Sequence, residues 1–130
     1  MAASGATPPA VFLCPMESLK NRADFLRANR GRRQVTPGFI LLARHRKPGE
    51  GDGSVLRVGY TCSKKLGNAV ARNRAKRRLR EIARAHLPKL GRAGWDYVLI
   101  GRPNEAESRQ FPNLSDDLKA ALNRIHGDQH

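Results

Sequence analysis

The chain has 130 residues, with 25 Lys or Arg against 11 Asp or Glu, and its formal net charge is +14 at pH 7. This length indicates one domain with a modest core, and no run approaches the roughly 20 apolar residues of a membrane-spanning helix. A pI near 11.2 favours nucleic acid as the partner.

Residues 1–17 are rich in Ala, Pro and Ser, and we expect them to form a disordered N-terminal extension. No basic residues precede their short apolar patch as they would in a signal peptide, which favours a cytoplasmic protein. Cys14 and Cys62 have no CxxC spacing, so we expect two free thiols and no zinc site. We assign 18–126 to a single domain and 127–130 to a tail.

The first predicted element is a short helix over Arg22–Asn29, with Asn21 as its N-cap. The apolar run FILLA predicts a strand within Gln34–Arg46, and residues 32–36 can pair as a short strand of their own. The Pro- and Gly-rich segment 48–54 is predicted to be a loop, and a hairpin connection suits it.

The next predicted strand, Val55–Cys62, alternates between two kinds of side chain. One face carries Leu56, Val58, Tyr60 and Cys62, and the other carries Arg57, Gly59 and Thr61. The first face suits the core, and the second is left open to a helix or a ligand.

A long basic helix follows, and we expect Pro88 and the glycines after it to break the chain. Trp95–Arg102 is then predicted to be a buried strand, and Ser115–Ile125 a final helix with apolar residues at helical spacing. The element order is therefore α-β-β-β-α-β-α. We predict an α+β sandwich with helices packed against one, mostly four-stranded sheet.

The basic helix is the most informative segment of the chain. From Arg72 to Arg84 it carries seven basic side chains, six of them Arg, against the single acid Glu81. Arg side chains four residues apart repel each other by roughly a few tenths of a kcal/mol per pair, so a polyanionic partner is the natural compensation. Arg favours phosphate and exposed bases, because its planar fork binds bidentately and stacks.

A helical wheel separates this helix into two faces. The apolar arc consists of Ala71, Ala75, Leu79, Ile82, Ala83 and His86. The basic side chains fill the other side, either as a solvated face or as a face for a ligand; the lack of interleaved acids favours a ligand. A membrane-surface helix is disfavoured, because the arc is mostly Ala and has no Trp or Phe.

The sequence offers no catalytic site of its own. The four His residues are scattered, no carboxylates have the spacing of a metal pair, and the phosphate-binding patterns GxxxxGK[ST] and GxGxxG are absent. If the chain serves an enzyme, the chemistry must therefore come from its partner.

The segment RVGYTCSKKLGNAVARNRAKRRLRE, Arg57–Glu81, resembles the signature of the bacterial ribonuclease P protein component, whose hallmark is an Arg-Asn-Arg helix after a Ser-Lys-Lys and Gly-Asn-Ala turn. Leu19–Arg33 and Trp95–Pro103 add weaker similarity in the expected order. The resemblance covers about residues 16–125.

The resemblance implies a small basic subunit that binds a large catalytic RNA, and the complex removes the 5′ leader from precursor tRNA. In this family the RNA holds Mg²⁺ and hydrolyses the phosphodiester, and we expect a monomeric protein in a 1:1 complex. It further implies a left-handed βαβ crossover through the basic helix, against the usual right-handed rule. A cleft between the first helix and the sheet is implied to take the single-stranded leader.

The resemblance also assigns residues. Those implied to bind the catalytic RNA are Lys64, Lys65, Gly67, Asn68, Arg72, Asn73, Arg74, Lys76, Arg77 and Arg80. Phe25 matches the first aromatic residue of the leader cleft, whereas Asn29 and Leu42 stand where relatives often have aromatics. Leader binding is then expected to rely more on charge, with Arg44 and Arg57 as candidates.

Other interpretations of the sequence stay open. A ribosomal or ribosome-assembly protein is the main alternative, since it also explains a basic α+β chain of this size. A DNA-binding regulator is disfavoured, because there are no dimerisation heptads and no helix-turn-helix pair. From the pattern alone, Phe25 suits the core better than a ligand platform, and Asn73 can be a surface residue without a role.

Overall fold

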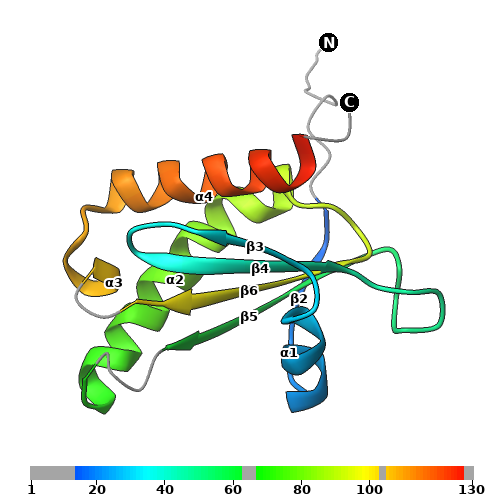
Figure 1. Ribbon diagram of the computed structural model, residues 1–130, viewed down its shortest axis with the longest axis horizontal. Helices are drawn as coiled ribbons and strands as arrows, with labels where there is room; N and C mark the ends of the chain where they lie inside the picture. Colours follow the sequence, from blue (N-terminus) through cyan, green and yellow to red (C-terminus); the bar gives the residue numbers. More distant parts are fainter. Residues whose placement is uncertain (1–13, 63–66, 103–104, 128–130) are drawn as a thin grey trace, which may run out of the picture.

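The computed structural model describes residues 14–62, 67–102 and 105–127 (Figure 1). Its strands are β2 Met16–Ser18, β3 Arg32–Val35, β4 Phe39–His45, β5 Leu56–Cys62 and β6 Trp95–Gly101. Its helices are α1 Arg22–Ala28, α2 Ala69–Leu90, α3 Glu105–Ser108 and α4 Phe111–Gly127. Within these residues no helix combines the length and apolar character needed to cross a membrane.

The strands form one mixed sheet in the order β2-β5-β6-β4-β3. β5 is parallel to both β2 and β6, whereas β4 is antiparallel to β6 and β3. α2 connects the parallel neighbours β5 and β6, which gives the βαβ unit whose left-handed crossover the resemblance implies. Helices α2 and α4 cover one face of the sheet and α1 lies on the other (Figure 1), so the predicted α+β sandwich is confirmed.

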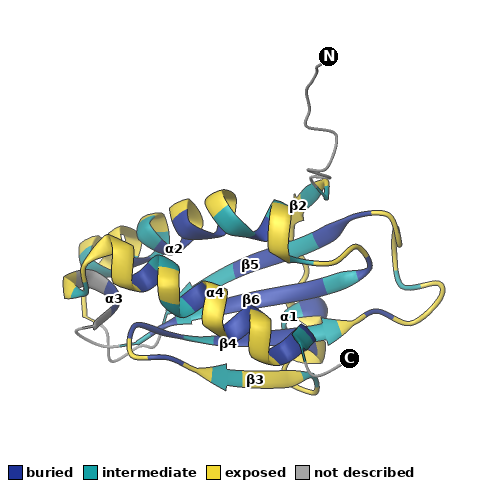
Figure 2. Cartoon of the chain, turned by 90° about the horizontal axis from the view of Figure 1, so that it is seen from above, coloured by how far each residue is buried: buried dark blue, intermediate teal, exposed yellow. Residues whose placement is uncertain are grey.

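The larger core lies between the sheet and the two long helices, and its side chains come from the inward faces of all three (Figure 2). The predicted apolar arc of α2 is confirmed at its centre, where Ala75, Leu79, Ile82 and Ala83 are fully buried. Each large aliphatic side chain buried in this way stabilises the fold by roughly 1.5–3 kcal/mol. This packing offsets the repulsion between the cations on the outer face of α2.

The smaller core lies under α1, on the face of β5 that the sequence left open. Phe25 and Ala28 of α1 pack there against Leu42 and Val98. A Cβ atom at Gly59 would lie 2.4 Å from the Phe25 ring, so the missing side chain lets the ring rest on the strand. This close contact sets how deeply α1 sits on the sheet.

The sheet has one more strand than predicted. β2 spans the boundary predicted between the extension 1–17 and the domain, and its three residues pair with Leu56–Val58 of β5. A strand this short has too few residues to show alternation, so only its pairing reveals it. The rest of the predicted extension, residues 1–13, lies outside the described residues, as does 128–130 of the predicted tail.

The predicted hairpin connection at 48–54 is wrong, because β6 lies between β4 and β5 in the sheet. The predicted break at Pro88 is also wrong: α2 continues through Pro88 to Leu90. The helix ends where Gly91 donates its N–H to the Leu87 carbonyl, with an N···O distance of 2.7 Å.

The final helix begins earlier than predicted, at Phe111 instead of Ser115. The short helix α3 precedes it.

A buried aromatic group joins α4 to the sheet. The Tyr97 hydroxyl accepts the Arg92 N–H at 2.9 Å and lies 2.8 Å from His126 Nε2. The His126 ring also packs edge-on against Trp95, with ring centroids 4.6 Å apart. Burial, followed by the charges of Arg92 and Arg32, lowers the pKa of His126 to about 4. The imidazole is therefore neutral in the folded protein at pH 7.

This pKa predicts acid-sensitive stability. The unfolded chain takes up a proton on His126 near its ordinary pKa of about 6.5, whereas the folded chain does so only near pH 4. The stabilisation is therefore complete above pH 6.5 and is lost as the pH falls toward 4. Between pH 7 and 5 we expect the free energy of unfolding to drop by on the order of 1–2 kcal/mol, measured by urea titration.

The control replaces one His at a time. His126→Gln should flatten the pH dependence of the free energy of unfolding, even if it also changes that free energy at pH 7. His86→Gln should flatten it less, because His86 is half-exposed, although burial lowers its pKa as well. An undiminished slope in His126→Gln would contradict the assignment.

Candidate nucleic-acid interface

The basic helix starts at a side-chain cap. The Asn68 carboxamide oxygen accepts the backbone N–H of Ala71 at 3.0 Å, which makes Asn68 the N-cap of α2. Gly67, just before it, has a φ of +132°, a backbone conformation that favours glycine. Of the loop predicted to contact RNA, Gly67 and Asn68 thus set the start of the helix, whereas Lys64 and Lys65 lie outside the described residues.

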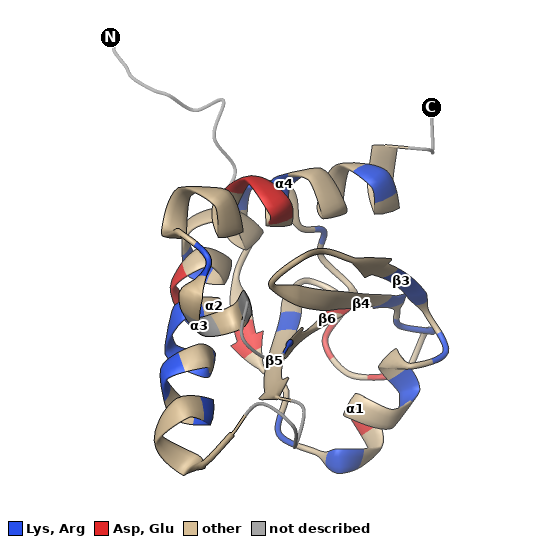
Figure 3. Cartoon of the chain, turned by 60° about the vertical axis from the view of Figure 1, so that its left-hand side comes forward, with Lys and Arg blue, Asp and Glu red and all other residues tan. Residues whose placement is uncertain are grey.

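The outer face of α2 presents the residues predicted to contact RNA, and its Lys and Arg residues extend over several turns (Figure 3). The exposed members are Asn73, Arg74, Arg77 and Arg80, and the half-buried ones are Arg72 and Lys76. Lys76, Arg77 and Arg80 form no ion pair with any carboxylate whose position the structure describes, and neither does Arg84. This face therefore carries uncompensated positive charge that a polyanion would neutralise.

Phe25 lines a hollow on the opposite side of the sheet. The hollow is lined by Lys20, Arg22, Phe25, Tyr60 and Thr61. Phe25 is half-buried: its ring packs on Gly59 and still borders this hollow. The two interpretations of Phe25 as core residue and as ligand platform therefore both have a structural basis. Lys20 and Arg22, which sequence reasoning passed over, supply the positive charge here.

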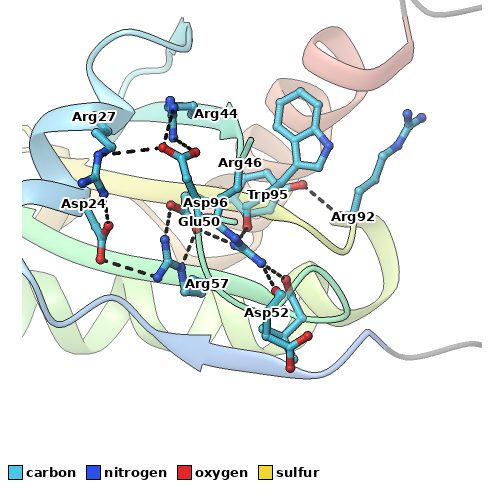
Figure 4. Close-up of polar contacts among 12 residues, drawn as sticks. Asp24, Arg27, Arg44, Arg46, Glu50, Asp52, Arg57, Arg92, Trp95 and Asp96 are labelled. Atoms are coloured by element: carbon cyan, nitrogen blue, oxygen red, sulfur yellow. Dashed lines mark hydrogen bonds and ion pairs between the residues drawn. The ribbon is translucent and has the colours of Figure 1, made fainter. Parts of the chain in front are cut away.

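The other two predicted cleft residues are held in ion pairs (Figure 4). Arg57 forms a bidentate pair with Asp96, at 2.8 and 2.7 Å, and its hydrogen bond with Asp96 raises the pKa of Arg57. Arg44 lies 3.0 Å from Glu50 and, through this hydrogen bond above all, lowers the pKa of Glu50 to about 2. Both guanidinium groups thus have carboxylate partners in the absence of RNA.

The two positions where relatives often have aromatics differ in exposure. Asn29 is exposed at the C-terminal end of α1, four residues after Phe25 and thus on the same side of the helix. Leu42 is 4% exposed and is packed beneath α1. An aromatic ring could reach solvent at Asn29, whereas at Leu42 it would have to displace part of the smaller core.

Asp96 is the centre of the polar contacts that hold this side together (Figure 4). It is buried, and besides Arg57 it binds Arg46 Nη1 at 2.6 Å. Arg46 is also buried and donates to the carbonyls of Val55, at 2.6 Å, and Trp95, at 3.1 Å. These contacts join the end of β4, the start of β5 and the start of β6 around one carboxylate.

The described residues offer no cluster of three or more His, Cys, Asp or Glu that could hold a metal ion. Both cysteines are free thiols, as predicted. The features that define the molecule are instead a small basic α+β domain, a cationic helix on one face of the sheet and a half-buried phenylalanine on the other. This combination is typical of proteins that bind a polyanion.

Comparison with known proteins gives the family. The family model of ribonuclease P matches residues 14–126. The ribonuclease P protein component of Ruegeria pomeroyi is 57% identical over 122 residues, which cover 92% of this chain and 96% of the relative. The ribonuclease P protein component of Erythrobacter litoralis is 50% identical, and the match covers 82% of this chain and 83% of the relative. The chain therefore belongs to the ribonuclease P protein family.

Solved structures agree with this assignment. The RNase P protein from Thermotoga maritima superimposes with a TM-score of 0.68 at 31% identity, covering 85% of this chain and 99% of that one. The Staphylococcus aureus RNase P protein gives a TM-score of 0.65 at 29% identity, and the match covers 84% of this chain and 94% of that one. The family resemblance noted in the sequence is thus confirmed in both sequence and fold.

The position of Asp96 predicts a large effect of a small change. Asp96→Asn removes the charge that compensates Arg46, whose side chain is 2% exposed. Breaking a buried ion pair from one side typically costs about 3–5 kcal/mol, and we expect a loss of this size in urea unfolding. Asp116→Asn is the matched control, because that side chain is 75% exposed and lies 3.9 Å from Lys119. Equal, small losses in both variants would contradict the role given to Asp96.

Proposed function

We propose that this chain is the protein subunit of a ribonuclease P ribonucleoprotein, which removes the 5′ leader from precursor tRNA, and that α2 binds the catalytic RNA. Family membership supports the activity. The observation that carries the RNA contact is that four α2 cations have no carboxylate partner among the described residues: Lys76, Arg77, Arg80 and Arg84. Asn73 lies among them and is exposed, so its amide can both donate to and accept from a base edge or a 2′-hydroxyl.

We assign the hydrolysis and its Mg²⁺ to the partner RNA, on the basis of family membership. The protein contributes binding and orientation, through charge on α2 and through the hollow beside α1. The proposed assembly is one protein chain with one catalytic RNA in the cytoplasm.

The single-stranded leader is proposed to lie in the hollow beside α1. Stacking of a base on Phe25 is supported by the ring's half-buried position at the hollow's wall. Lys20 and Arg22 are placed to meet the leader phosphates there. Arg44 and Arg57 stay candidates for leader contact. Because both are held in ion pairs, their main role is to support the sheet surface next to α1.

The direct test is reconstitution. The protein is mixed with the catalytic RNA of the same organism, and cleavage of a precursor tRNA is followed at low Mg²⁺, where the RNA alone is slow. We expect the protein to restore cleavage at the mature 5′ end. Binding of ribosomal RNA without any gain in cleavage would instead support the ribosomal alternative.

One prediction concerns the α2 face. Replacing Arg72, Arg74 and Arg77 with Ala should weaken binding to the catalytic RNA and reduce the log–log salt slope by roughly 0.7–0.9 for each phosphate that the variant no longer binds. Folding should be nearly unchanged, because the inward face of α2 is untouched. The matched control is Arg124→Ala, an exposed Arg on α4. An unaltered salt slope in the triple variant would rule out this surface.

A further prediction concerns the leader. Phe25→Leu keeps apolar volume on the sheet but removes the flat ring, so affinity for precursor tRNA should fall by about 1–3 kcal/mol relative to mature tRNA. Asn29→Phe should raise it, since the new ring would stand one helical turn from Phe25. Leu42→Met is the control for the smaller core and should not change leader binding. If Phe25→Leu lowers precursor and mature tRNA binding equally, the leader lies elsewhere.

A further inference from the structure

Tyr60 lies in the part of β5 that extends beyond its edge neighbour among the described strands. β2, the edge strand, pairs with β5 only as far as Ser18 opposite Val58, so β5 continues past its neighbour. Tyr60 lies two residues beyond that point and is half-buried. Its side chain packs against the larger core, and part of it stays exposed.

Arg80 of α2 lies over this ring. Its guanidinium carbon is 5.4 Å from the centroid of the Tyr60 ring, within the range of a cation–π contact. Arg80 is exposed, and no described carboxylate competes for its guanidinium. The ring thus restrains the guanidinium while leaving it open to solvent.

Two hollows meet at Tyr60. The first is the hollow beside α1 that also contains Lys20 and Phe25. The second lies on the α2 side of the sheet and is lined by Met16, Glu17, Ser18, Val58, Tyr60, Arg80 and Arg84. Tyr60 is therefore shared between the side of the sheet assigned to the leader and the side assigned to the catalytic RNA.

We propose that Tyr60 and Arg80 form a stacking platform for one unpaired RNA base at this junction, an inference that rests on the proposed function. The guanidinium of an Arg that is held over an aromatic ring is a planar, charged group, and such groups stack on exposed bases. Arg84 would meet the phosphate next to that base. Glu17 lies across the same hollow and repels phosphate, which directs the backbone toward Arg84.

An unpaired base could come from the leader or from the catalytic RNA, and the same measurements distinguish the two. Affinity is measured for the catalytic RNA alone, and then for precursor and mature tRNA on the assembled complex. A reduction confined to precursor tRNA identifies a leader base. A reduction for the catalytic RNA itself identifies one of its unpaired bases.

The decisive variants are Arg80→Lys and Tyr60→Leu. Arg80→Lys keeps the charge but removes the planar fork, and we expect roughly 5- to 10-fold weaker binding of one RNA with an unchanged salt slope. Tyr60→Leu should weaken binding by a similar factor, and the double variant by little more than either change alone, because both remove the same platform. Tyr60→Phe keeps the ring and should bind like the parent protein, as should the distant Arg124→Lys.

Several results would overturn the proposal. Wild-type affinity of Arg80→Lys for all three RNAs is one, and a reduced salt slope in that variant is another, since it would mean a phosphate contact only. Should Tyr60→Leu fail to fold, Arg80→Lys decides alone, because Arg80 is exposed. Cleavage by the reconstituted wild-type complex is measured in parallel, so that absence of the platform can be told from failure of the proposed function.

Discussion

The buried Asp96 carboxylate is the interaction on which the α1 side of the molecule depends. It sits opposite Arg44 on β4 and Arg57 on β5, and it binds Arg57 and Arg46 directly. Arg57 in turn reaches Asp24 of α1 at 3.5 Å. Burying either charge without the other would carry a large desolvation cost. The pairing therefore fixes helix, sheet and loop relative to one another.

The acidic residues that pair with arginines lie mainly on the α1 side of the sheet, whereas, among the described residues, the cations of α2 have few acids near them. Asp24, Glu50 and Asp96, three of its 11 acids, pair with arginines on the α1 side. On α2 the single acid Glu81 is exposed among cations. α2 tolerates this, because burial of residues such as Leu79 and Ile82 contributes more than the like-charge pairs cost. The result is one face stabilised internally and one face left for an external polyanion.

The sequence predicted what depends on local pattern. The period of α2 identified its buried face, and the alternation of β5 correctly left one face open, which α1 occupies. Contacts between distant residues could not be predicted: Arg57 and Asp96 are 39 positions apart, and nothing local links them. For the same reason the sequence indicated Arg57 only as a candidate for leader contact, without its carboxylate partner, and Tyr60 only as a core residue. Its contact with Arg80, 20 positions later in the chain, arises from the packing of α2 against β5, which no local pattern shows.

The central claim is that RNA neutralises the α2 face while the α1-side arginines stay paired. Arginine modification by phenylglyoxal, read by mass spectrometry with and without the catalytic RNA, tests it directly. The account predicts that Arg77 and Arg80 react in the free protein and are protected in the complex, and that buried Arg46 is unreactive in both. Continued reactivity of Arg77 and Arg80 in the complex, with protection elsewhere on the surface, would contradict it.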